Sequence, residues 1–120
     1  MDSSDITVIF GGNIARWEYE DKTIEISVNG PISFYRYYHD ECLIAFVSGS
    51  GKVQKLTGFK ANGKKQFSSE PPMKGQFIQF CEYFNEPLVV LCAYYQIGWN
   101  QGYFAFSPKD GKLRFINEAR

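Results

Sequence analysis

The chain alternates short apolar runs with polar turns along its whole length. Runs of four to nine residues rich in Ile, Val, Phe and Tyr are separated by turn residues every eight to twelve positions. This spacing predicts short antiparallel strands, and no segment keeps the 3.6-residue period of a helix. The expected strands cover residues 6–10, 14–20, 23–28, 32–38, 42–48, 53–60, 64–67, 76–84, 88–95, 102–107 and 112–116.

The turns between these strands are marked by Gly, Pro, Asn and Asp. We expect turns at Asn29-Gly30-Pro31, at 39–41, at 48–51, at Asn62-Gly63, at 85–87 and at Lys109-Asp110-Gly111. The segment SSEPPMKG at 68–75 predicts a connector, because its consecutive prolines lack the amide donors that a helix or a central strand needs.

Part of this pattern is repeated. The segments YYHDECLIAFV (37–47) and YFNEPLVVLCA (83–93) each contain an aromatic pair, a polar turn and an apolar strand, at an offset of 46 residues. The segments KANGKKQF (60–67) and SPKDGKLRF (107–115) each contain a turn, a Lys and a Phe three residues after that Lys, at an offset of 48. A fainter copy, WEYEDKTIEI (17–26), lies roughly 42 residues upstream. The chain therefore consists of about three similar units.

A period of this length that holds several antiparallel strands has the size of a propeller blade. The segment SPKDGKLRFI also resembles the outer hairpin of β-propeller repeats, which often close on a polar-Asp-Gly-Lys turn. We expect a single all-β domain over residues 1–120, with about three antiparallel blade-like meanders at roughly 6–30, 31–68 and 75–117. Because closed propellers take four to eight blades, three would form a partial (half) β-propeller with open edges. The alternative is a β-sandwich or barrel of short strands in which the repeat is fortuitous.

Composition agrees with a β-rich protein that has one modest core. The chain has 120 residues, of which 18% are aromatic, and its 11 Gly and 5 Pro supply turns. Cys42, Cys81 and Cys92 lie in apolar runs and form no C-x-x-C pair, so we expect buried free thiols in the cytoplasm. His39 is the sole histidine, so we expect no metal site and no cofactor. The N-terminus lacks the basic region of a signal peptide, and no apolar run is long enough to span a membrane.

Catalytic motifs are not found in the sequence. There is no P-loop, no dinucleotide fingerprint, no G-x-S-x-G and no H-E-x-x-H. His39, Asp40, Glu41 and Cys42 form the one cluster of a base, carboxylates and a thiol, but consecutive residues on a turn splay apart. We expect a polar corner there rather than an active site, and we expect no enzymatic activity.

Charge is unevenly distributed along a chain whose net charge is zero. Residues 1–41 hold eight acidic and three basic residues, a balance of −5, whereas residues 42–75 hold six Lys and one Glu, a balance of +5. Such asymmetry affects the choice of partner more than the fold. The lysines share their segment with Phe59 and Phe67, a pattern found in single-stranded nucleic-acid binders. Because that segment has no Arg and the pI is near 6.6, we keep nucleic-acid binding only as an alternative.

The aromatic residues are the better indication of function. In SFYRYYH (33–39) both faces of the expected strand are aromatic, so one of them can lie outside the core. Trp99 is expected on a loop between Gly98 and Asn100, where it would be an exposed anchor of the type that dominates protein interfaces.

A one-domain, non-catalytic β protein with segregated charge and aromatic loops is similar in general character to bacterial toxin-immunity proteins. That resemblance implies a cytoplasmic inhibitor that occludes the active site of one cognate toxin domain, such as a basic nuclease of a contact-dependent inhibition system. Two alternatives stay open. One is a self-associating propeller-like scaffold or small-ligand-binding module that completes itself as a homodimer, and the other is the single-stranded nucleic-acid binder. The expected partner-binding residues are acidic groups that steer the encounter and aromatic or polar anchors: Glu18, Glu20, Asp21, Tyr35, Tyr37, Asp40, Glu41, Tyr94, Trp99 and Asn100.

Overall fold

The computed structural model describes residues 6–50 and 53–119, and its regular structure is almost entirely β. Short 3-10 segments lie between strands, among them η1 (His39–Glu41) and η3 (Pro72–Lys74). Each strand expected from the sequence overlaps one observed strand. The strands are β1 (Ile9–Gly11), β2 (Ile14–Tyr19), β3 (Lys22–Ser27), β4 (Ile32–Tyr38), β5 (Leu43–Ser48), β6 (Lys55–Lys60), β7 (Lys65–Ser69), β8 (Gln76–Tyr83), β9 (Glu86–Tyr95), β10 (Trp99–Phe106) and β11 (Leu113–Glu118).

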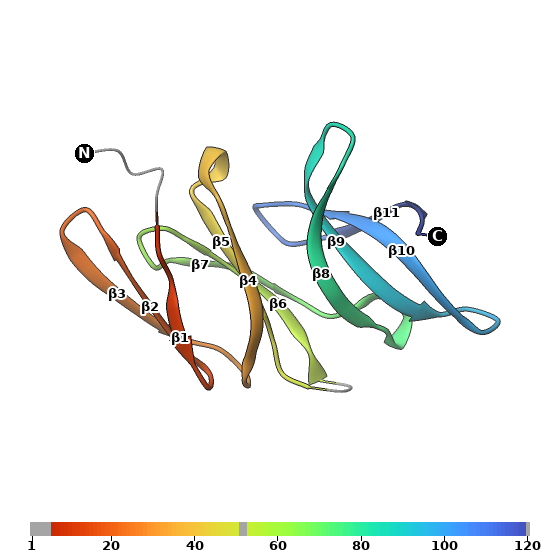
Figure 1. Cartoon of the computed structure of the whole chain (residues 1–120), viewed down its shortest axis with the longest axis horizontal. Coiled ribbons are helices and arrows are strands. Elements are labelled where there is room, and N and C mark those ends of the chain that lie inside the picture. The colour runs from red at the N-terminus through yellow and green to blue at the C-terminus, as the bar shows by residue number, and fades with distance from the viewer. Residues whose placement is uncertain (1–5, 51–52, 120) are drawn as a thin grey trace.

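The strands form three antiparallel sheets, β1–β3, β4–β7 and β8–β11. Every pair of hydrogen-bonded strands is consecutive in the chain, so each sheet is a simple meander, as the sequence predicted. Figure 1 shows the sheets side by side in chain order along the long axis of the molecule. Within the described residues no sheet closes on itself, so the chain forms neither a closed propeller nor a barrel.

The central sheet, β4–β7, is covered on both faces. All six residues of β5 are buried, and successive side chains of a strand point to opposite sides. Leu43, Ala45 and Val47 belong to the core shared with β8–β11, whereas Ile44 and Phe46 belong to the core shared with β1–β3. A continuous apolar run is the pattern expected of a strand with two dry faces.

The first sheet packs one face against the core and exposes the other to solvent; the exposed face is called its wet face below. On β2, Ala15 and Trp17 are buried while Arg16 and Glu18 are exposed. The indole N–H of Trp17 donates a 2.7 Å hydrogen bond to the carbonyl of Ala61, which ties this sheet to the β6–β7 turn. This alternation places a polar surface at the N-terminal end of the stack of sheets.

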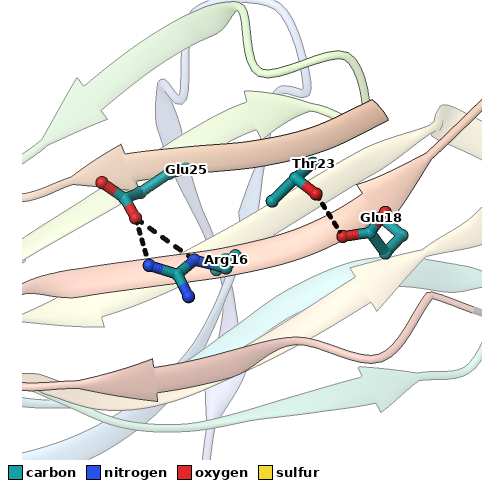
Figure 2. A network of polar contacts seen from close by, with 4 residues as sticks. All are labelled: Arg16, Glu18, Thr23 and Glu25. Carbon is teal, nitrogen blue, oxygen red and sulfur yellow. Dashed lines mark hydrogen bonds and ion pairs between the residues drawn. The ribbon is translucent and has the colours of Figure 1, made fainter. Parts of the chain in front are cut away.

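Figure 2 shows the polar side chains of that wet face, which pair across β2 and β3. Arg16 lies 2.5 Å from the carboxylate of Glu25, and the hydroxyl of Thr23 donates a 2.5 Å hydrogen bond to Glu18. Directly opposed residues of opposite charge stabilise a sheet and keep its surface hydrated. The β1–β3 sheet therefore ends the stack without requiring a further layer.

The two repeated hairpin turns form with the same hydrogen bond. The side-chain oxygen of Asn62 accepts from the backbone N–H of Lys64 at 3.0 Å, and that of Asp110 accepts from the N–H of Lys112 at 3.0 Å. Both bonds are of the Asx-turn type. The N–H of Lys112 and then the Ser107 hydroxyl hold the pKa of Asp110 below its usual value. Local turn chemistry therefore explains why the same short motif recurs 48 residues later.

Candidate protein-binding site

The β9–β10 hairpin extends beyond the rest of its sheet. β8 begins opposite Ala93 and β11 ends opposite Gly102, whereas the β9–β10 ladder continues to the Tyr95–Trp99 pair. Figure 1 shows this hairpin projecting at the C-terminal end of the molecule. Residues 95–99, called the hairpin tip below, therefore form the end of a two-stranded ribbon that neither β8 nor β11 flanks.

Three large apolar side chains of the hairpin tip are exposed. Tyr95 is 56% exposed, Ile97 101% and Trp99 65%. Tyr95 and Trp99 are cross-strand partners whose ring centroids lie 5.6 Å apart in an edge-to-face arrangement. Trp99 is the first residue of β10 rather than a loop residue, contrary to the expectation, but its side chain is exposed as expected. Clustered exposed aromatic and aliphatic groups of this kind mark interaction sites.

The turn of the hairpin tip is braced by hydrogen bonds. The backbone N–H of Gln96 donates to the carbonyl of Gly98 at 2.8 Å. The side-chain amide of Asn100 donates to the carbonyls of Gln96 and Gly98 at 3.0 and 3.1 Å. Asn100, which we expected to contact a partner, therefore holds the shape of the turn. A braced turn loses less conformational entropy on binding than a mobile one.

Ile97 occupies a strained backbone conformation at the apex. Its φ is +53°, in the left-handed region that β-branched residues rarely adopt. Such a conformation costs on the order of 1–3 kcal/mol and persists mainly at functional sites. Because the side chain is fully exposed, no packing within the chain offsets this cost.

We expect Ile97→Asn to raise the free energy of unfolding by about 0.5–1 kcal/mol, because Asn tolerates positive φ better than any β-branched residue. Urea unfolding of both proteins measures the difference. Ile9→Asn is the matched control: Ile9 is 72% exposed on β1 and its φ is not positive, so this variant should show no gain. A lower free energy of unfolding for Ile97→Asn than for the wild type would contradict the claim that the backbone at Ile97 is strained.

A pocket of about 490 Å³ lies beside the indole of Trp99. A pocket of this size admits one or two side chains of a protein partner. Together, an exposed aromatic pair, an apical aliphatic side chain and an adjacent pocket resemble the anchor region of a protein interface. The pocket is lined by Ala93, Trp99, Asn100, Gln101, Glu118 and Ala119.

Comparison with protein families, with curated proteins and with solved structures finds no match to this chain.

Three tyrosines predicted to contact a partner lie in or against the core. Tyr94 is only 3% exposed and stacks edge-to-face on Phe104, so it is not an exposed anchor. Alternation along β9 turns Tyr94 toward the central sheet and Tyr95 away from it. Tyr35 and Tyr37 are half-buried against the core between the first two sheets. The exposed ring of this aromatic pair is therefore that of Tyr95, the next residue along β9.

The expected acidic residues lie far from the hairpin tip. Glu18, Glu20 and Asp21 belong to β2 and the β2–β3 turn, at the opposite end of the long axis in Figure 1. Asp40 and Glu41 belong to η1, between β4 and β5. Their side chains are exposed except for that of Glu41, which is half-buried. The structure therefore does not bring the predicted acidic and aromatic residues into one site.

The lysine segment makes two polar contacts within the chain. The ammonium of Lys60 donates a 3.0 Å hydrogen bond to the backbone carbonyl of Glu41, and Lys55 lies 3.5 Å from the carboxylate of Glu70 in the same segment. Phe59 and Phe67 are 5% and 6% exposed, so these aromatic residues of the lysine segment are not available to stack on bases. The hypothesis that the chain binds single-stranded nucleic acid therefore loses its support from aromatic residues.

The polar corner at η1 holds an exposed thiol. The ring Nδ1 of His39 lies 3.4 Å from the Asp40 carboxylate. Cys42 follows η1 with φ +50° and is exposed, so the expectation of a buried thiol is wrong there and right for Cys92. Burial raises the pKa of Cys92 to about 12. No group of three or more His, Cys, Asp or Glu side chains among the described residues is placed to hold a metal ion.

Two residues of the candidate site were not predicted from the sequence. Tyr95 and Ile97 are both exposed, yet neither was expected to bind a partner. The signal was present in AYYQIGWN, where an Ile stands directly before the Gly of a predicted turn. In addition, no helix in the described ranges is long and apolar enough to cross a membrane.

Proposed function

We propose that the chain is a non-catalytic, protein-binding inhibitor of the general kind represented by bacterial toxin-immunity proteins. It inserts the hairpin tip into a concave site of its partner and thereby blocks that site. The observation that carries the proposal is the fully exposed, strained Ile97 at the apex of a braced turn whose two strands carry the exposed rings of Tyr95 and Trp99. A convex, rigid, apolar element of this kind is complementary to a cleft rather than to a flat surface.

In this proposal the acidic residues do not contact the site that the tip fills. Glu18, Glu20 and Asp21 are exposed at the far end of a molecule about 50 Å long, several Debye lengths from the hairpin tip at physiological ionic strength, so salt largely screens their attraction for a partner bound there. The apolar anchors of the hairpin tip therefore carry the binding and set the lifetime of the complex.

The architecture that presents the tip is proposed to be a partial β-propeller. Each sheet is a meander, the connectors run from the last strand of one sheet to the first strand of the next, and β4 and β8 contact each other. These are features of successive propeller blades. The exposed thiol of Cys42 supports a reducing, cytoplasmic location.

The test is affinity capture from a lysate of the source cell with the wild-type chain and with Trp99→Ala. We expect a stoichiometric partner that the wild type retains and that Trp99→Ala binds at least about 30-fold more weakly, as for an interface hot spot. Co-expression then measures function: the partner alone should slow growth, and the wild type but not Trp99→Ala should restore it.

Phe84→Ala is the matched control, because Phe84 is an aromatic residue that is 89% exposed on the β8–β9 turn, away from the hairpin tip. It should retain the partner. Ile97→Asn should weaken binding while stabilising the fold, so loss of binding cannot be attributed to unfolding. Equal retention by Trp99→Ala and the wild type, or a partner whose activity the chain does not inhibit, would refute the proposal.

A further inference from the structure

The β9–β10 hairpin that carries the hairpin tip is almost free of charge. From Pro87 to Pro108 the sequence contains no Asp, Glu, Lys, Arg or His, although the whole chain has 13 acidic and 13 basic residues. The hairpin tip itself reads YQIGW over residues 95–99. The part of the molecule that is proposed to enter the partner therefore presents no charged side chain to it.

One charged residue stands at the base of the hairpin tip. The register of β10 and β11 places Glu118 opposite Gly102, three residues beyond Trp99, and Glu118 lines the pocket beside the indole. Protein interfaces usually have an apolar centre and a polar rim. In the proposed complex this carboxylate belongs to the rim, and the residues of the hairpin tip form the centre.

Polar backbone groups of the turn are satisfied inside the chain. The side-chain amide of Asn100 donates to the carbonyls of Gln96 and Gly98 at 3.0 and 3.1 Å, and the N–H of Gln96 donates to the Gly98 carbonyl at 2.8 Å. A polar group that enters an apolar site without a hydrogen bond is costly. Because these groups keep their internal partners, the turn can enter an apolar cleft at a lower desolvation cost than an unbraced turn.

A phosphate-binding active site, such as that of a nuclease, is a poor complement to this turn. Sites of that class hold Lys, Arg or metal cations that neutralise the phosphate charge. An apolar wedge placed over these cations excludes water without supplying an anion, and an unpaired buried charge is strongly unfavourable. The expected acidic residues of the first sheet, Glu18, Glu20 and Asp21, lie at the opposite end of the long axis and cannot supply it (Figure 1).

The exposed side chains of the hairpin tip suit an apolar cleft. Ile97 is fully exposed at the apex, and the rings of Tyr95 and Trp99 pair across the two strands with their centroids 5.6 Å apart. Sites that bind the apolar group of a substrate are concave and lined mainly by hydrophobic and aromatic side chains. The apical side chain can fill such a cleft while the aromatic pair covers its edge.

We infer that the site blocked in the partner is an uncharged, apolar cleft that binds an apolar group of the partner's own substrate, and that Ile97 takes the place of that group. The inference rests on the proposed function and specifies the class of partner. It replaces the basic nuclease that the resemblance to toxin-immunity proteins offered as an example.

Opposite charges placed at the apex test the inference. The probe is the protein that affinity capture retains in a Trp99-dependent manner, and calorimetry measures its dissociation constant for Ile97→Asp and for Ile97→Lys. Both variants should bind at least about 100-fold more weakly than the wild type, because an apolar cleft leaves either charge buried and unpaired. Binding of Ile97→Asp as tight as that of the wild type would indicate a basic cleft, and the same result for Ile97→Lys an acidic one; either overturns the inference.

Ile9→Asp and Ile9→Lys are the matched controls. Ile9 is 72% exposed on β1, in the first sheet, so both variants should bind like the wild type. Because Ile97 is fully exposed, its two variants should also stay folded, and urea unfolding of each checks this.

Salt dependence gives a second measurement on the wild type. Its dissociation constant should change less than about threefold between roughly 50 and 500 mM NaCl, a range over which contacts between exposed charges are strongly screened. Binding that is more than about tenfold weaker at the higher salt concentration would overturn the inference and leave the proposed function standing. If no captured protein depends on Trp99, the proposed function is refuted and the inference with it.

Discussion

Replacing Phe46 by Ala is expected to lower the free energy of unfolding by about 3–5 kcal/mol. Phe46 is fully buried on β5 and lies against three other aromatic residues, with ring centroids 6.1 Å from Trp17, 6.1 Å from Tyr35 and 5.9 Å from Phe59. Its loss leaves a cavity between the first and second sheets that stiff strands fill only in part. The whole free energy of unfolding of a domain of this size is about 5–15 kcal/mol. Phe46→Ala should therefore unfold at a much lower urea concentration than the wild type.

Phe84→Ala is the control for that measurement. Phe84 is 89% exposed, so the same change of side chain should alter the free energy of unfolding by less than about 0.5 kcal/mol. A cost below about 1 kcal/mol for Phe46→Ala would mean that the first two sheets do not share a packed core.

Replacing Gly111 by Ala is expected to cost about 2–4 kcal/mol, from the backbone and from a steric clash. The φ of Gly111 is +70°, which L-residues adopt at a cost. A Cβ atom at this position would overlap the ring of Phe67 and the hydroxyl of Ser69, two groups of the neighbouring sheet. Phe67 is buried, and Ser69 donates a 2.8 Å hydrogen bond to the Gly111 carbonyl, so neither moves away freely.

Gly98→Ala separates the two contributions. Gly98 also has a positive φ, +109°, but a Cβ atom there would have no neighbour within 4 Å. This variant should therefore lose only the backbone part, about 1–2 kcal/mol. If thermal or urea unfolding gave equal losses for both variants, the close approach of the β10–β11 turn to β7 would be refuted.

The fold was predictable because its determinants are local. Asn62-Gly63 and Asp110-Gly111 specify their turns through side chains two residues from the groups they bind, and the alternation of β2 marks its wet face. The number of sheets and the strand order follow from such signals when every strand pairs with its neighbour in sequence. Whether three meanders make part of a propeller depends on sheet-to-sheet angles, which no local pattern encodes.

The candidate site was less predictable, because exposure depends on what covers a face. Alternation separates Tyr94 from Tyr95 but does not say which of them meets the central sheet. Trp99 was assigned to a loop because Gly98 precedes it, yet the β9–β10 ladder continues past the other strands and includes it. The ammonium of Lys60, in the basic segment, donates to the backbone carbonyl of Glu41, 19 residues earlier in the acidic segment, a contact that the charge pattern alone does not predict.

The strictly sequential strand pairing also determines how the chain matures during synthesis. Each hairpin can close as soon as its second strand leaves the ribosome, so the backbone ladder requires no long-range search. Side-chain packing is completed later than the backbone ladder. Leu43, Ala45 and Val47 of β5 remain uncovered until β8–β11 has been synthesised. The nascent chain therefore carries an apolar surface through the second half of translation, and that interval is when it is most prone to aggregate.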